Sequence, residues 1–253
     1  MKIVNQINHE NYHERLNELI NPSLNLLQNN RNTNKKKILE VCHTGKFLMF
    51  FKNLKIQKLY ERPDFILAQD DILIGLEHEV LLSQSHKEKE GFYDNIFSMV
   101  EEDLRSEKQL PNFLANCYLN KYLDFQPKHK PEIRTILKDV ITEFVLTNQL
   151  VENPLIDRIF KMPHSQISLC PNLGAWWQQN LSEQNLLEAI MKKEEKVIDY
   201  KKAGCDKLWL LIVVGSTGES SYEIPDNLNF LFESVFDKVF LLEDFNNNLY
   251  QIN

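Results

Sequence analysis

Two short, mainly apolar runs in the first third of the chain are typical of β-strands. They cover Pro63 to Ala68 and Ile72 to Leu82, and a short polar turn separates them. The pattern predicts a β-hairpin. If Asp70-Asp71 forms its two-residue turn, Asp64 lies directly opposite Glu77.

Apolar spacing indicates further elements on both sides of this hairpin. Residues 186–202 have the spacing of an amphipathic helix that ends at Gly204, and the apolar run Leu208 to Val214 predicts a buried central strand. The segment Ile38 to Phe51 fits either a helix or a strand. The other expected elements are helices at 9–20, where Asn21-Pro22 ends the helix, and at 227–235, and strands at 238–242 and 249–252.

The middle of the chain has a different pattern, which is mainly helical and interrupted by prolines. We interpret residues 95–185 as an α-helical insertion in an α/β core. The core is then formed by residues 1–94 and 186–253. The expected fold class is α/β, with a mixed sheet flanked by helices.

Charge and hydropathy exclude several classes of protein. The longest apolar run has seven residues, far fewer than the roughly 20 that cross a bilayer, and the first residues turn polar before a signal peptide could form. We therefore expect a soluble cytoplasmic protein with no membrane partner. Its four cysteines lack Cys-x-x-Cys spacing, which favours reduced thiols. A net charge of −7 argues against non-specific coating of nucleic acid but leaves room for a local basic groove.

The facing pair Asp64 and Glu77 is the strongest candidate for chemistry. Like charges directly opposite each other destabilise a sheet, so a half-buried acid pair needs a proton, a metal or an arginine. Two carboxylates, a backbone carbonyl and waters would suit Mg²⁺ or Mn²⁺. Glu79 lies on the same strand face as Glu77, where it serves the site or forms an ordinary salt bridge with Arg62. The opposing interpretation is that these acids lie on the solvent face of a hairpin.

These residues also resemble a known signature. Arg62-Pro63-Asp64-Phe65-Ile66-Leu67 followed by Ile74-Gly75-Leu76-Glu77-His78-Glu79 resembles the Pro-Asp…(Asp/Glu)-x-Lys motif of the restriction-endonuclease-like nuclease superfamily. The pattern Lys193-x-x-Lys196-x-x-x-Tyr200, with the strand after it, is similar to the helix and strand that complete the core of that superfamily. Together the segments cover about a quarter of the chain.

The resemblance implies a metal-dependent nuclease core. Asp64 and Glu77 would bind Mg²⁺ or Mn²⁺, and an acid from the first helix, Glu10 or Glu14, would assist. The position that usually carries the catalytic lysine is Glu79. The resemblance implies that Lys193 or Lys196 on the neighbouring helix supplies the missing ammonium, because hydrolysis needs a positioned cation near the phosphate.

Two weaker signals suggest other ligands. His9-Glu10-Asn11-Tyr12-His13 matches the His-Glu-x-x-His pattern of zinc peptidases, although no third ligand stands out. A basic cluster lies near Tyr118 and Tyr122 and is a candidate phosphate-contacting surface, with a solvated face as the alternative. Its members are Lys121, Lys128, His129, Lys130 and Arg134.

The sequence thus leads to competing functions. The first is a Mg²⁺- or Mn²⁺-dependent nuclease that hydrolyses phosphodiester bonds in DNA, with RNA as the other substrate. The alternative is a catalytically inactive protein of the same fold that binds or inhibits a protein partner, and the Glu-x-Glu variant and acidic balance favour it. The third is a zinc enzyme that uses several histidines.

Overall fold

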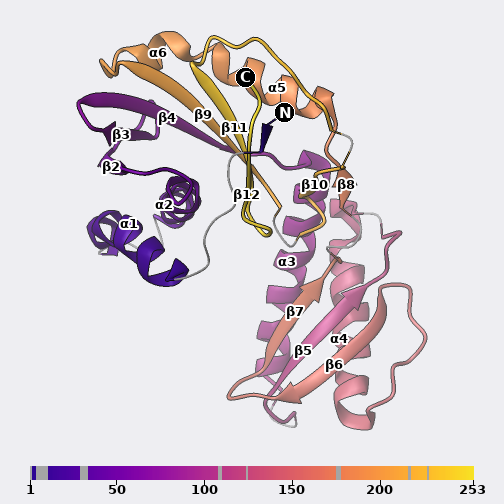
Figure 1. Cartoon of the computed structure of the whole chain (residues 1–253). Coiled ribbons are helices and arrows are strands. Elements are labelled where there is room, and N and C mark those ends of the chain that lie inside the picture. Colours follow the sequence, from indigo (N-terminus) through magenta and orange to yellow (C-terminus); the bar gives the residue numbers. More distant parts are fainter. Residues whose placement is uncertain are drawn as a thin grey trace. The chain divides into compact units, whose positions relative to one another are not determined.

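The computed structural model describes residues 2–3, 11–28, 34–107, 110–123, 125–174, 178–215, 218–226 and 228–253. The chain folds into two compact units (Figure 1). Unit 1 comprises Met1–Leu81, Asn180–Ser216 and Tyr222–Asn253, and unit 2 comprises Leu82–Gln179 and Thr217–Ser221.

Unit 1 is built on a seven-stranded mixed sheet with the order β1-β12-β11-β9-β4-β3-β2. The central strand β9 pairs in parallel with β4 and β11, and the outer pairs are antiparallel. The strands are β1 (Lys2–Ile3), β2 (Leu54–Leu59), β3 (Phe65–Gln69), β4 (Ile72–Val80), β9 (Lys207–Val214), β11 (Lys238–Glu243) and β12 (Asn248–Gln251). β9 is central because its residues from Leu208 to Val214 are apolar on both faces.

Helices cover both faces of this sheet (Figure 1). On one face α1 (Tyr12–Leu27) and α2 (Lys35–Leu48) share a core with the odd-numbered residues of β9, such as Trp209. On the other, α5 (Glu183–Glu194) and α6 (Val197–Lys201) share a core with the even-numbered residues, such as Leu210. This arrangement confirms the expected α/β class with a mixed sheet between helices.

The predicted hairpin is confirmed, together with its register. Phe65 pairs with Leu76 and Gln69 pairs with Ile72, which leaves Asp70 and Asp71 as the turn. Asp70 has φ 52°, a left-handed conformation that aspartate tolerates in tight turns. The ladder ends at the pair Phe65 and Leu76, so Asp64 stands one residue before β3 and Glu77 one residue further along β4.

Several other expectations need correction. The N-terminal helix does not end at Asn21, because α1 runs through Pro22 and its next turns pack Leu24 and Leu27 into the core. The ambiguous segment 38–51 is mostly helix α2. The expected helix 186–202 is broken into α5 and α6, and the break turns Val197 and Tyr200 toward the core.

The expected helix at 227–235 is wrong for residues 228–235, which have no regular structure. Glu194 accepts hydrogen bonds from the Ser234 hydroxyl and the Val235 amide, while Phe230 packs into the core. These contacts hold the segment without helical bonds. The C-terminal strands β11 and β12 and the helix end at Gly204, with φ 71°, agree with the predictions.

Unit 2 shows that the segment 95–185 is not an all-helical insertion. It contains a three-stranded sheet of order β6-β5-β7 backed by two helices. Its elements are α3 (Gln84–Arg105), β5 (Phe113–Leu119), the 3-10 turn η2 (Pro127–His129), α4 (Lys130–Thr147), β6 (Ile156–Pro163) and β7 (Ser168–Asn172). β5 alternates buried and half-exposed residues along its whole length, which is the strand period that the helical interpretation missed.

Two further features complete the description. The short strands β8 (Gln179–Asn180) and β10 (Tyr222–Glu223) pair with each other. Among the described helices, none combines the length and the apolar character needed to cross a membrane.

Candidate active site

Three of the residues singled out from sequence meet at one point of unit 1. Glu77 and Glu79 lie on β4, and Lys193 reaches them from α5. The ammonium Nζ of Lys193 is 2.8 Å from Glu77 Oε1 and 2.8 Å from Glu79 Oε2, and it donates to the carbonyl oxygen of His78 at 3.2 Å. Glu77 and Lys193 are buried, whereas the Glu79 side chain is 30% exposed.

Asp64 joins this group through the backbone of β4. It stands just before β3, where its Oδ2 accepts a hydrogen bond from the amide of His78 at 2.9 Å, and its Oδ1 lies 3.3 Å from Nζ of Lys37. The amide of His78 therefore binds Asp64 while its carbonyl binds Lys193. One peptide segment thus fixes both halves of the site.

The surroundings of Glu77 disfavour the charged form of its carboxyl group. Burial and the negative charge of Asp64 raise the pKa of Glu77, and Lys193 opposes that shift. Burial alone would lower the pKa of Lys193, but the carboxylates of Glu77 and Glu79 raise it above its ordinary value. Lys193 is therefore a charged ammonium.

The second oxygen of Glu77 has only a weak partner among the described residues. Its buried Oε2 and the buried hydroxyl of Tyr200 do not complete a hydrogen bond of full geometry, but Tyr200 still interacts with the Glu77 carboxylate as a donor and lowers its pKa. Burial and the Glu77 carboxylate raise the pKa of Tyr200, so its hydroxyl stays protonated. A buried carboxylate oxygen with so weak a donor would be stabilised by any further group that reaches it.

The sequence analysis missed Lys37, which lies on α2 and links Asp64 to another acid. Its ammonium is 2.7 Å from Oε2 of the buried Glu40. The helical acid joined to Asp64 is therefore Glu40, not Glu14, which is exposed on α1, while Glu10 lies outside the described residues. The spacing of Lys37, Glu40 and Thr44, which places all three on one helix face, could have revealed this polar stripe.

A buried histidine pair lies behind the site and was also missed. Nδ1 of His43 on α2 is 3.0 Å from Nε2 of His78, and the two rings stack. Burial lowers the pKa of both histidines. For His43 the carboxylate of Asp244 opposes this shift and Lys46 adds to it, whereas nearby positive charges lower the pKa of His78 further. A neutral pair with one shared hydrogen bond follows, and it ties His78 to α2.

Other predicted contacts do not form. Lys196 is exposed between α5 and α6, away from the carboxylates. Arg62 pairs with Asp199 at 3.3 Å, so the expected Arg62–Glu79 salt bridge is wrong. Of the zinc-peptidase pattern, His13 is exposed on α1, and His9 lies outside the described residues.

The basic cluster of unit 2 is partly neutralised. Arg134 forms two hydrogen bonds with Asp103, at 2.5 and 2.7 Å, and Lys130 binds Asn95. The guanidinium carbon of Arg158, which the sequence analysis did not single out, lies 4.3 Å from the ring centroid of Tyr118. The cluster is thus a set of local pairs and stacks more than a continuous basic surface.

Asp64, Glu77 and the His78 carbonyl bring together oxygen atoms, which are the ligands that hard divalent cations prefer. Lys37, Lys193 and the His78 amide already bind several of these oxygens. Within the described ranges, no cluster of three or more His, Cys, Asp or Glu side chains is arranged to hold a metal. An ion here would thus keep several waters, as Mg²⁺ commonly does.

Comparison of the chain with protein-family models, with curated proteins and with solved structures finds no match.

Proposed function

We propose that this protein is a metal-dependent phosphodiester hydrolase acting on DNA or RNA, with a restriction-endonuclease-like core in unit 1. The observation that carries the proposal is the 2.8 Å approach of Lys193 to Glu77 beside Asp64. It supports an acid pair and a lysine as one site, although the lysine comes from a helix and not from the strand. Lys193, and not Lys196, is assigned the role of the catalytic ammonium.

Asp64, Glu77 and the carbonyl of His78 would hold Mg²⁺ or Mn²⁺. The bound ion would lower the pKa of a coordinated water and stabilise charge on a phosphoryl oxygen. The raised pKa of Glu77 supports this assignment, because a carboxylate that is unstable alone gains most from a cation.

Each remaining residue has a distinct role in this proposal. The ammonium of Lys193 orients the attacking water or stabilises the phosphate in the transition state. Glu79 is a positioning residue, because its partly exposed carboxylate would still pair with Lys193 if Glu77 bound a metal ion. Lys37 and Glu40 fix Asp64 from the α2 side.

The test is a Mn²⁺-dependent cleavage assay on single- and double-stranded DNA and on RNA. Wild type should cleave, whereas Glu77→Ala and Lys193→Met should lose at least about a hundredfold in rate, the scale of one lost catalytic group. Lys196→Met is the matched control and should retain activity. Equal residual activity in wild type and Glu77→Ala would refute the proposal.

A second candidate is an inactive protein of the same fold that binds a protein partner. Glu79 favours it, because it stands where the resemblance expects lysine and pairs with Lys193. An absence of Mn²⁺ binding in calorimetry, together with a stable protein complex in pull-downs, would support this candidate over the hydrolase.

A further inference from the structure

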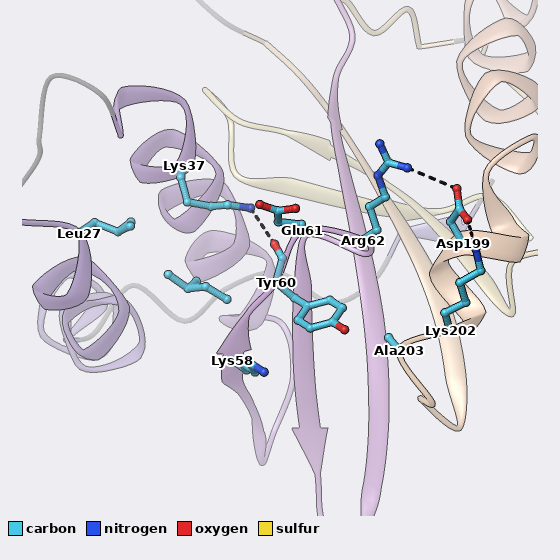
Figure 2. A pocket seen from close by; sticks show the side chains of 10 residues that line it. Leu27, Lys37, Lys58, Tyr60, Glu61, Arg62, Asp199, Lys202 and Ala203 are labelled. Atoms are coloured by element: carbon cyan, nitrogen blue, oxygen red, sulfur yellow. Dashed lines mark hydrogen bonds and ion pairs between the residues drawn. The ribbon is translucent and has the colours of Figure 1, made fainter.

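A cavity of about 660 Å³ opens in unit 1 (Figure 2). Helix α1, helix α2, strand β2, the loop that follows β2 and the end of α6 contribute its walls. Small-molecule sites have volumes of about 300–1,000 Å³, so the cavity is large enough for one nucleotide.

Basic and apolar groups share the walls of this cavity. Lys37, Lys58, Arg62 and Lys202 bring four positive charges, against two negative charges from Glu61 and Asp199. Such a local excess stands out in a chain whose net charge is −7. Leu27, Leu59, Ala203 and the ring of Tyr60 supply apolar surface.

The cations of the cavity differ in whether an acidic side chain already pairs with them. Arg62 and Lys202 both pair with Asp199, at 3.3 and 2.6 Å, as Figure 2 shows. Lys58 has no acidic partner among the described residues, and its ammonium lies 5.1 Å from the ring centroid of Tyr60. Lys58 is therefore the cation most available to an anion that enters the cavity.

Lys37 connects the cavity with the candidate active site. Its side chain lines the cavity, and its ammonium donates to the carbonyl oxygen of Tyr60 at 3.4 Å (Figure 2). The same ammonium lies 3.3 Å from Oδ1 of Asp64. A ligand in the cavity would thus lie one side chain away from Asp64.

We propose that this cavity binds one nucleotide of the nucleic-acid substrate, adjacent to the phosphate that is cleaved. The apolar wall takes the base, and Lys58 with Arg62 takes the phosphate. Flat apolar surface beside a free ammonium matches a nucleotide better than an acidic peptide, whose charged side chains would leave the apolar wall uncovered. The inference rests on the proposed hydrolase function, since it assigns a subsite to that substrate.

The experiment measures binding of 5′-AMP, adenosine and orthophosphate to the full-length protein by calorimetry without divalent metal. We expect 5′-AMP to bind more tightly than either part alone. Lys58→Glu and Ala203→Phe should each weaken 5′-AMP binding by about tenfold or more, since one replaces a positive charge by a negative one and the other fills the cavity. Lys55→Glu, which makes the same charge change at an exposed position of the same strand, should leave binding unchanged.

Several outcomes would overturn the inference. Equal affinity for orthophosphate and 5′-AMP would mean that no base is bound, and equal losses in the Lys55 and Lys58 variants would mean that only overall charge matters. Circular dichroism of each variant separates lost binding from lost folding.

The same protein also separates this inference from the proposed function. Glu77→Gln should abolish cleavage and keep 5′-AMP binding, because Glu77 does not line the cavity. Cleavage without Lys58-dependent binding would reject the subsite alone. Lys58-dependent binding without any cleavage would reject the hydrolase and leave a nucleotide-binding cavity.

Discussion

At the scale of single residues, the backbone of His78 organises the site more than any side chain does. Its amide holds Asp64, its carbonyl holds Lys193, and its ring is hydrogen-bonded to His43. Both polar backbone groups of one buried residue are thus used to orient charged partners. The charges are fixed before any substrate arrives, which is the arrangement that electrostatic catalysis requires.

Lys193→Met should destabilise unit 1. Removing one partner of a buried ion pair costs about 3–5 kcal/mol, and protonation of Glu77 should limit the loss at neutral pH to about 3 kcal/mol. Urea unfolding would measure it, with Lys192→Met as the control because Lys192 is exposed on the same helix. Equal effects of the two substitutions would mean that the buried ion pair contributes nothing to stability.

The raised pKa of Glu77 predicts a pH-dependent stability difference between wild type and Glu77→Gln. Above the ordinary value of 4.5, unfolded Glu77 has released its proton while folded Glu77 still holds it. The folded state then binds more protons, so wild type loses stability relative to Glu77→Gln as pH rises through this window. The histidines contribute equally to both proteins, so their effect cancels in the difference.

Chemical denaturation of both proteins between about pH 4 and pH 8 would measure this difference. A difference that stays flat, or that favours wild type increasingly as pH rises, would contradict the upward shift in the pKa of Glu77.

The sequence predicted part of this site and could not predict the rest. Hairpin register follows from the position of the two-residue turn, so the positions of Asp64 and Glu77 could be derived. Lys37, Glu40 and His43 lie on a helix whose type the sequence left open, and their approach depends on how α2 packs on the sheet. Which of Lys193 and Lys196 faces Glu77 depends on the break between α5 and α6, which apolar spacing did not reveal.

At the scale of elements, close packing around β4 keeps Asp64 in place. A Cβ atom added to Gly75 would lie 2.8 Å from Cγ of Pro63 and 3.1 Å from a methyl group of Leu208. Glycine at this position therefore allows the residue before Asp64 to lie against the centre of the sheet.

Gly75→Ala should lower the free energy of unfolding by about 1–3 kcal/mol, the usual effect of overpacking, and should weaken any activity that depends on Asp64. Gly91→Ala is the matched control, since no atom lies within 4 Å of its added Cβ and it stands inside α3. That change should stabilise α3 by about 0.5–1 kcal/mol. Thermal unfolding of the two variants should thus shift in opposite directions, and a neutral Gly75→Ala would show that Pro63 moves freely.

The sequence predicted helices and strands correctly where a segment had one clear pattern of apolar residues. Strand β9 and the hairpin were found because each has a single clear pattern. β5 was taken as helix because the prolines around it suggested only breaks in a helical region, although its alternation is regular. The segment 228–235 has apolar residues at helical spacing, but Ser234 and Val235 donate hydrogen bonds to the carboxylate of Glu194 instead of forming a helix. The local sequence pattern does not reveal a contact with so distant a residue.

At the scale of the whole molecule, each unit has a hydrophobic core of its own. The core of unit 2 is formed by residues from Tyr93 to Leu173, whereas the two cores of unit 1 use none of these residues. Unit 2 nevertheless includes a short segment from a distant part of the chain. Lys89 lies 3.3 Å from Glu219, and Glu90 accepts hydrogen bonds from the amide and hydroxyl of Ser220, each at 2.8 Å.

A fragment of residues 82–179 should therefore fold but respond differently to substitution. In the full chain, Glu90→Gln weakens two buried charge-assisted hydrogen bonds and should destabilise unit 2 by about 1–3 kcal/mol. In the fragment Ser220 is absent, and the remaining partner of Glu90 is the half-exposed Lys87, whose ammonium lies 3.1 Å from Oε2 of Glu90. The same substitution should therefore cost the fragment less than about 1 kcal/mol. Hydrogen exchange of the β5 amides in both proteins measures the stability of unit 2 without assuming that the two units unfold together. If Glu90→Gln destabilised the fragment and the full chain equally, Glu90 would act within α3 alone, and the segment 217–221 would contribute nothing to the stability of unit 2.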